Sequence, residues 1–246
     1  MNPDTWLERY ESGCEDAIWN DMRQLGAAIR QPEYYEHAVA VCDAMAHRAR
    51  RNIEKLIERL SGEGYIFHSL YDEEKQDVSP LIPPTSDAPD LARWLDEQFT
   101  IPLSVHSWIR IVGDVSFIGT HPDWPESSAA DPLMVEFEYS EVGGDPREYH
   151  VELYEDWRDS QEGETPAEPF LLEFAPDRLH KDDTSGGAPY AILTSDACAE
   201  GVVRAEHDYP LVSYFNSVFE CGGFPHGPAL GQYWRYHKLG AGLETL

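Results

Sequence analysis

The sequence lacks most of the segments by which membrane and secreted proteins are recognised. No apolar run approaches the roughly 20 residues that a membrane-spanning helix needs. The first residues, "MNPDTWLERYE", contain no basic segment followed by an apolar one, so they predict no secretory signal. We therefore expect a cytoplasmic protein that does not enter a membrane.

Cysteine is scarce and scattered. None of the four cysteines, at positions 14, 42, 198 and 221, has C-x-x-C spacing, which argues against a zinc ribbon or a redox motif. Buried free thiols in a reducing compartment are the simplest interpretation. Cys221 has only Glu220 as a charged neighbour in "FECGGF", whereas a thiolate nucleophile needs an electropositive setting.

The common catalytic motifs are also absent. The sequence contains no G-x-x-x-x-G-K-[ST], no G-x-G-x-x-G after a strand, no G-x-S-x-G and no H-E-x-x-H. This disfavours P-loop ATPases, dinucleotide-binding enzymes, serine hydrolases of the elbow type and zinc proteases. We expect no catalytic residue, no metal and no cofactor.

Basic residues are few: 18, against 46 acidic ones, for a net charge of −28. Such a surface excludes nucleic acid as a simple partner, because phosphate binding needs positive charge. The densest window, Glu136–Glu168, carries 12 acids and 2 bases. Two interpretations stay open. The acids attract a basic protein, or they serve solubility or a salty cytoplasm, as the low share of lysine suggests.

The residues that are present predict an α+β fold. Residues 4–30 and 33–60 have apolar positions at helical spacing and predict an N-terminal helical pair. The proline-rich stretch "YDEEKQDVSPLIPPTSDAP" follows and is typical of a linker. We therefore predict a helical region with linker over 1–84, an α+β domain over 85–226 and a C-terminal tail over 227–246.

Within the second region the patterns predict helices, then a mainly antiparallel sheet flanked by helices. "APDLARWLDEQF" and "SVHSWIRIVG" predict helices, with Gly113 ending the second. "VSFIG", "PLMVEFEYS", "REYHVELYEDW", "PFLLEFAPD", "PYAILTS" and "GVVRAEHD" predict strands, and "YPLVSYFNSVFECGG" predicts a helix that ends at its two glycines. "GGD" between the second and third strands is typical of a hairpin.

The candidate partner-binding residues follow from this pattern. The expected strands turn Glu136, Glu138 and Glu152 to the outer face, with Glu155 and Asp156 at the end of the second. Trp124, in a loop between prolines, is the candidate exposed anchor, because tryptophan is enriched at binding hot spots.

A chemical alternative rests on two histidine clusters. His121 with Asp123, and His180 with Asp182 and Asp183, offer metal ligands or an acid–base pair for a small-molecule or metal-dependent enzyme. Against it, His121 precedes a proline, which predicts an extended backbone and a structural role for the ring.

Three segments together resemble a known family. They are "LARWLDEQFTIPLSVHSWIRIVGDVSFIGTHPDW", "FAPDRLHKDDTSGGAPYAI" and "LVSYFNSVFECGGFP". Their order of helix, Ile-Pro turn, Trp-bearing helix, glycine corner and strand resembles the SUKH superfamily (the Smi/Knr-type domain), in a variant with an added N-terminal helical region. The resemblance covers about residues 85–225, and the corner reads "VGDV" where the superfamily has a glycine-rich corner.

This resemblance implies a non-enzymatic protein-binding module. Many bacterial members are immunity proteins that bind and neutralise toxin domains, often nucleases, and fungal members are interaction hubs. The superfamily has no shared catalytic motif, so no catalytic residue is carried over. An acidic domain suits a basic, possibly nuclease, toxin as the protein partner.

Overall fold

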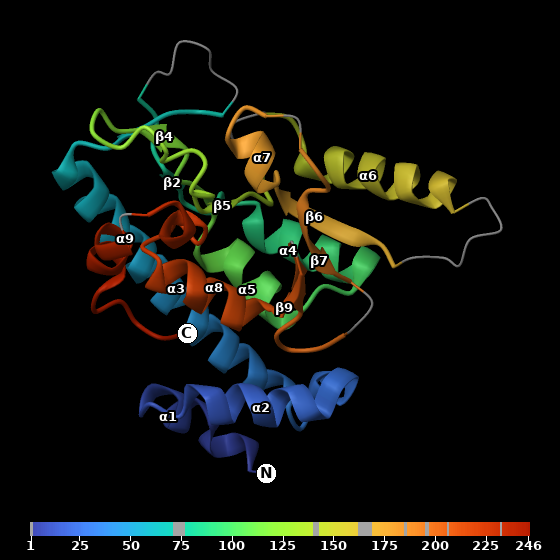
Figure 1. Ribbon diagram of the computed structural model, residues 1–246. Helices are drawn as coiled ribbons and strands as arrows, with labels where there is room; N and C mark the ends of the chain where they lie inside the picture. Colours follow the sequence, from blue (N-terminus) through green and yellow to red (C-terminus); the bar gives the residue numbers. More distant parts are fainter. Residues whose placement is uncertain are drawn as a thin grey trace.

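The chain folds into helices and short antiparallel strands (Figure 1). The computed structural model describes residues 2–70, 77–139, 143–161, 169–184, 186–194, 197–205, 207–231 and 233–246. Parts of the predicted linker and of the acidic window, at 71–76, 140–142 and 162–168, lie outside these residues. The predicted α+β class is confirmed, with N-terminal helices followed by antiparallel sheets.

The elements have the following bounds in the described residues. The α-helices are α1 (Trp6–Glu11), α2 (Glu15–Leu25), α3 (Tyr35–Glu63), α4 (Ala88–Phe99), α5 (Leu103–Ile111), α6 (Pro146–Ser160), α7 (Arg178–Lys181), α8 (Leu211–Glu220) and α9 (Tyr233–Gly240). The strands are β1 (Ile66–Phe67), β2 (Leu81–Ile82), β3 (Asp114–Ser116), β4 (Gly119–Thr120), β5 (Met134–Val135), β6 (Leu171–Ala175), β7 (Tyr190–Leu193), β8 (Val202–Arg204) and β9 (Asp208–Pro210). Three 3-10 helices are η1 (Pro3–Thr5), η2 (Gly26–Arg30) and η3 (Gly227–Leu230).

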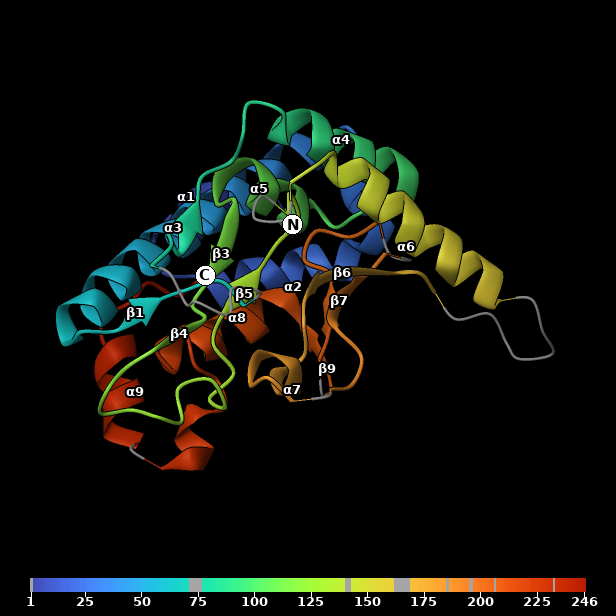
Figure 2. The ribbon, with the colours of Figure 1, turned by 90° about the horizontal axis from the view of Figure 1, so that it is seen from above.

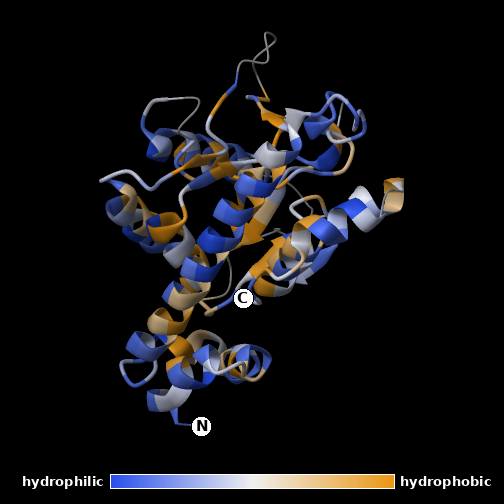
Figure 3. Cartoon of the chain, turned by 90° about the vertical axis from the view of Figure 1, so that its left-hand side faces the viewer, coloured by the Kyte–Doolittle hydropathy of each residue, from blue (hydrophilic) through white to orange (hydrophobic). Residues whose placement is uncertain are grey.

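The N-terminal helices follow the predicted apolar spacing. The first predicted helix is divided into α1, α2 and η2, and the second is the single helix α3. The whole predicted stripe of α3 is buried; it consists of Ala38, Cys42, Met45, Ala49, Ile53, Leu56 and Leu60. Gly64 ends α3 in the left-handed conformation (φ 90°) that glycine adopts most easily. Figure 3 shows the hydrophilic second half of α3 turned toward the viewer.

Three small antiparallel sheets carry the rest of the fold. β1 pairs with β4, β2–β3–β5 form a second sheet, and β6–β7–β8–β9 form a third in sequence order. The segments predicted as "PFLLEFAPD", "PYAILTS" and "GVVRAEHD" contain β6, β7 and β8, and α8 follows as predicted. The predicted strand "PLMVEFEYS" is shorter than expected, since only Met134 and Val135 pair as β5.

One part of the core lies between α5, α8 and the strands, which are neighbours in the view from above (Figure 2). Trp108 of α5 stacks on Phe215 of α8 with ring centroids 4.3 Å apart. Three strands contribute side chains to the same space: Val135 from β5, Phe174 from β6 and Ile192 from β7. The predicted domain division at residue 85 stays a prediction. One buried hydrophobic cluster runs from Trp6 to Leu246 and includes residues on both sides of that division.

Candidate functional site

Helix α6 starts at a sequence signal that the strand prediction overlooked. The Asp145 carboxylate accepts a hydrogen bond from the backbone N–H of Arg147 at 3.0 Å, and Pro146 occupies the first helical position. Aspartate at the cap and proline in the first turn are strong helix-start signals. The prediction of a hairpin at "GGD" and a strand over "REYHVELYEDW" is therefore wrong, because residues 147–157 lie entirely within the helix Pro146–Ser160.

One face of α6 packs onto the body of the protein. His150, Leu153, Tyr154 and Trp157 recur at helical spacing, and the last three pack against the core. The ring centroids of Tyr154 and Trp157 lie 5.3 and 5.7 Å from that of Phe170. His150 is fully buried, and its Nε2 donates to the carbonyl oxygen of Phe137 at 3.1 Å. Burial lowers the pKa of His150 to about 4, so this ring is neutral at pH 7.

The opposite face of α6 is acidic. Glu148, Glu152, Glu155 and Asp159 are spaced 4, 3 and 4 residues apart and are all exposed. We name these four residues the acidic stripe. Asp156 is exposed beside it. Arg158 offsets part of the charge, with Nη2 3.9 Å from Glu155 and 3.2 Å from Asp159.

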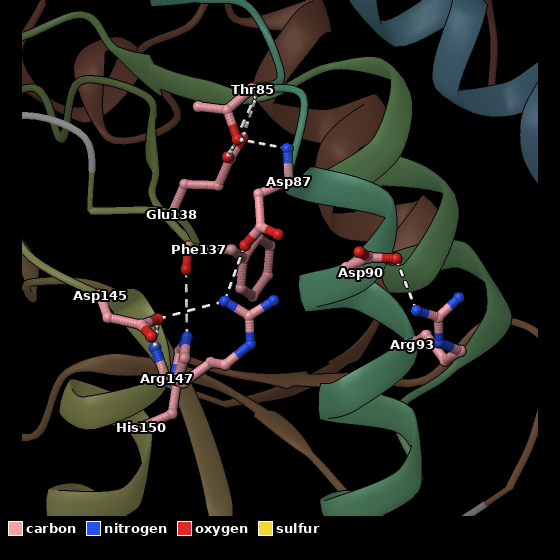
Figure 4. Close-up of polar contacts among 9 residues, drawn as sticks. All are labelled: Thr85, Asp87, Asp90, Arg93, Phe137, Glu138, Asp145, Arg147 and His150. Carbon is pink, nitrogen blue, oxygen red and sulfur yellow. Dashed lines mark hydrogen bonds and ion pairs between the residues drawn. The ribbon is translucent and has the colours of Figure 1, made fainter.

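The start of α6 is joined to the start of α4 by a small polar network (Figure 4). Arg147 Nη1 lies 2.7 Å from the Asp87 carboxylate and 3.2 Å from that of Asp145. Beyond this joint, α6 extends away from the body in both ribbon views (Figures 1 and 2). The stripe is thus presented on a helix that is anchored at one end and along one face.

Glu136 and Glu138 do not belong to this exposed surface, and their prediction as outward-facing partner-binding residues is wrong. Both are buried, at 6% and 8% exposure. The Glu138 carboxylate accepts from the Thr85 backbone N–H at 3.2 Å and from the Thr85 hydroxyl, just before α4 begins (Figure 4). Burial raises the pKa of Glu138. Through its hydrogen bonds to Thr85, the Glu138 side chain ties the segment after β5 to the start of α4.

The prediction that Trp124 is an exposed anchor is also wrong. It is 2% exposed and forms part of an aromatic cluster, with ring centroids 4.7 Å from Phe224 and 5.4 Å from Tyr236. Its Nε1 donates to the Tyr236 hydroxyl at 3.2 Å. The predicted exposed anchor is a core residue, because α9 and the segment after α8 cover the loop that carries it.

The histidine clusters of the enzyme alternative are not brought together as one constellation. His121 Nε2 donates to the Glu63 carbonyl at 2.8 Å, and its Nδ1 accepts from the Asp123 N–H at 3.0 Å. Both ring nitrogens are thus used in fixing the end of α3 to the loop. His180 pairs instead with Asp177, through its Nδ1.

A pocket of about 390 Å³ brings His121 together with Asp182 and Asp183, while His180 and Asp123 are not among its lining residues. Within the described residues, no three His, Cys, Asp or Glu side chains are placed to hold a metal ion. All four cysteines are free, but the expectation of buried thiols is right only for Cys42, because Cys14 is exposed and Cys198 and Cys221 are half-buried. Burial together with Glu220 raises the pKa of the Cys221 thiol.

Sequence reasoning found Glu152, Glu155 and Asp156 as exposed acids but missed Glu148 and Asp159. The signal that could have found them is the spacing of 4, 3 and 4 along residues 148–159, after the Asp-Pro start at 145. Comparison with known proteins found no matching family model, curated protein or solved structure. Among the described residues, no helix combines the length and the apolar character that crossing a membrane requires.

Proposed function

We propose that this chain is a protein-binding module that recognises a basic partner through the acidic stripe of α6. In its most concrete form, which the SUKH resemblance suggests, it is a non-enzymatic, cytoplasmic immunity-type protein that neutralises a basic toxin domain. The observation that carries the proposal is the stripe itself, four exposed carboxylates on one face of a helix that stands out from the body.

Only the first residue of the stripe is favoured by the helix that carries it, because Glu148 lies in the first turn of α6, near the positive end of the helix dipole. Like charges three and four residues apart destabilise a helix by about 0.2–0.5 kcal/mol per pair. Glu148, Glu152 and Glu155 form such pairs, and Arg158 offsets only the end of the row. A function in recognition accounts for an arrangement that folding alone disfavours.

Two exposed apolar side chains flank the stripe and would add contact area. Tyr149 is 39% exposed on one side of it and Val151 is 40% exposed on the other. Charge would speed the encounter with a basic partner, since complementary fields raise association rates by about 10–1,000-fold at low salt. The net charge of −28 acts in the same direction.

The test uses the full chain as bait in a lysate of its source cell, followed by direct binding with the purified captured protein. The stripe variant is Glu148→Gln, Glu152→Gln, Glu155→Gln and Asp159→Asn together. The matched control removes four exposed acids from the N-terminal region: Glu8→Gln, Glu11→Gln, Asp16→Asn and Glu36→Gln. Both variants change the net charge by the same amount.

We expect a basic protein that binds the wild type and the control with similar affinity and loses at least about tenfold in affinity for the stripe variant, with a smaller salt dependence. Toxicity of that protein, relieved on coexpression with the chain, would identify the immunity role. Equal binding to stripe and control variants would show that total charge, rather than this surface, matters, and would overturn the proposal. So would the absence of any captured protein that binds directly.

A further inference from the structure

A second polar site lies away from α6. The pocket of about 390 Å³ is formed by the β1–β4 pair, the loop around Trp124 and the end of α7. Its volume is within the range of about 300–1,000 Å³ that is usual for small-molecule sites. The lining residues that matter here are His68, Leu70, Trp124, Ser128, Asp182 and Asp183. No residue of the acidic stripe is among them.

The charge of this pocket is negative. Lys181 also lines it, but its ammonium is 2.8 Å from the Asp131 carboxylate, and both side chains are buried. Asp131 does not line the pocket, so a carboxylate outside the pocket neutralises the Lys181 charge. Asp182 and Asp183 then leave two negative charges at the pocket. Asp182 accepts a hydrogen bond from the Ser128 hydroxyl at 2.5 Å, which fixes its carboxylate.

His68 supplies an independent observation. It is 7% exposed, and its Nδ1 faces the Ser69 carbonyl at 3.0 Å. A carbonyl only accepts, so Nδ1 carries the proton and Nε2 of the neutral ring is an acceptor. This Nε2 is buried and has no hydrogen-bond partner among the described residues. An unpaired buried acceptor is costly, and His68 is one of the residues that line the pocket. A ligand that donates to this ring would relieve that cost.

We propose that this pocket binds a primary alkylammonium group, either of a free amine or of a lysine side chain. Its N–H groups donate to His68 Nε2 and to the carboxylates of Asp182 and Asp183. Its methylene groups lie against the apolar wall that Leu70 and Trp124 provide. The site is separate from the proposed partner surface, so it extends the proposed function and does not depend on it.

The test is calorimetric titration of the full chain with putrescine, and with N-acetyl-lysine amide as the model of a lysine side chain. Butanediol is the neutral analogue and succinate the anionic one. We expect saturable binding at one site for an amine and none for the two analogues. Asp182→Asn combined with Asp183→Asn should weaken amine binding by at least about fivefold. Binding by only one of the two amines supports the proposal and identifies the source of the group.

Two matched variants separate the pocket from general counterion binding. Asp123→Asn lies on the neighbouring loop and Glu155→Gln lies in the acidic stripe, and neither residue lines the pocket. Both should leave the affinity unchanged. In the wild type, the amine should shift the ¹⁵N resonance of His68 Nε2, a measurement that does not depend on the folding of any variant. Unsaturable binding, equal loss in the control variants, equal binding of butanediol or an unmoved His68 resonance would each overturn the proposal.

Discussion

Arg147, in the first turn of α6, contacts Asp87, the residue that caps α4, with the guanidinium Nη1 2.7 Å from the carboxylate Oδ2. The two residues are 60 positions apart in the chain. The contact orients α6, and with it the acidic stripe, against α4. Because the Asp87 side chain is 53% exposed, the pair is screened and contributes little to global stability.

Arg147→Ala should therefore lower the free energy of unfolding by only about 0.2–1 kcal/mol but loosen the start of α6. Hydrogen exchange of the α6 backbone amides should become faster, while exchange in α3 stays unchanged. The matched control is Arg93→Ala, which breaks the exposed Arg93–Asp90 pair inside α4 and should not affect α6 (Figure 4). Unchanged exchange in α6 of the Arg147 variant would contradict the anchoring role.

Trp124 is buried and Trp234 is exposed, so the same substitution at both positions tests whether Trp124 belongs to the core. Trp124→Ala should destabilise the protein by about 3–5 kcal/mol, because it removes a large side chain from the aromatic core. Trp234, at 64% exposure, should tolerate the same change within about 0.5 kcal/mol. Urea unfolding of both variants measures the difference. Similar costs at the two positions would contradict the assignment of Trp124 to the core.

The buried Lys181–Asp131 pair should behave as a unit. Asp131 has a left-handed backbone (φ 59°) and also accepts from the Tyr190 hydroxyl at 3.0 Å. Asp131→Asn tolerates this backbone and can still accept from Tyr190, but it leaves the Lys181 ammonium unpaired, at an expected cost of about 3–5 kcal/mol. Adding Lys181→Met should recover most of that loss, since no buried charge then remains.

The measurement is a double-mutant cycle of unfolding free energies with Asp131→Asn, Lys181→Met and the combination. Additive costs in the double variant would show that the two charges are not coupled, and the assignment of a neutralised lysine to the pocket wall would then be wrong.

The sequence predicted best those elements whose signals are local. The apolar stripe of α3 and the glycine stops after α5 and α8 were all confirmed. Gly113 shows why such a signal is reliable. Its φ is 88°, and a Cβ at this position would lie 2.2 Å from the Ile82 carbonyl oxygen, so only glycine fits.

The predictions from the sequence were wrong where a helical and a strand periodicity overlap. They were also wrong where a residue packs against residues that are distant in the chain. In α6, Tyr149, Val151 and Leu153 alternate like a strand, while His150, Leu153 and Trp157 follow a helix; the Asp145–Pro146 start decides between them. Trp124 is buried by Tyr65, Phe224 and Tyr236, which no local pattern connects to its loop. No local pattern in the sequence predicts the pairing of Lys181 with Asp131, which is 50 positions away.

The buried ring of His150 should make folding stability depend on pH. Its pKa is about 4 in the folded protein, below the ordinary value of 6.5 that the unfolded chain retains. Between these values the unfolded state binds the additional proton, so stability falls as the pH is lowered from 6.5 towards 4, by up to about 3 kcal/mol. Because His150 holds α6 to the Phe137 carbonyl, α6 should be released before or together with global unfolding.

His150→Gln is the matched variant, since its amide can donate to the same carbonyl but does not titrate. Urea unfolding from pH 7 to pH 4 should show a shallower loss of stability in this variant than in the wild type. Glu138, whose pKa is raised by burial, contributes with the opposite sign, because stability from its protonated form is lost as the pH rises. That contribution is common to both proteins and cancels in their difference. NMR titration of His150 in the wild type provides the direct check: an imidazole that protonates near pH 6.5 in the folded state would contradict the burial argument, as would equal pH slopes in the two proteins.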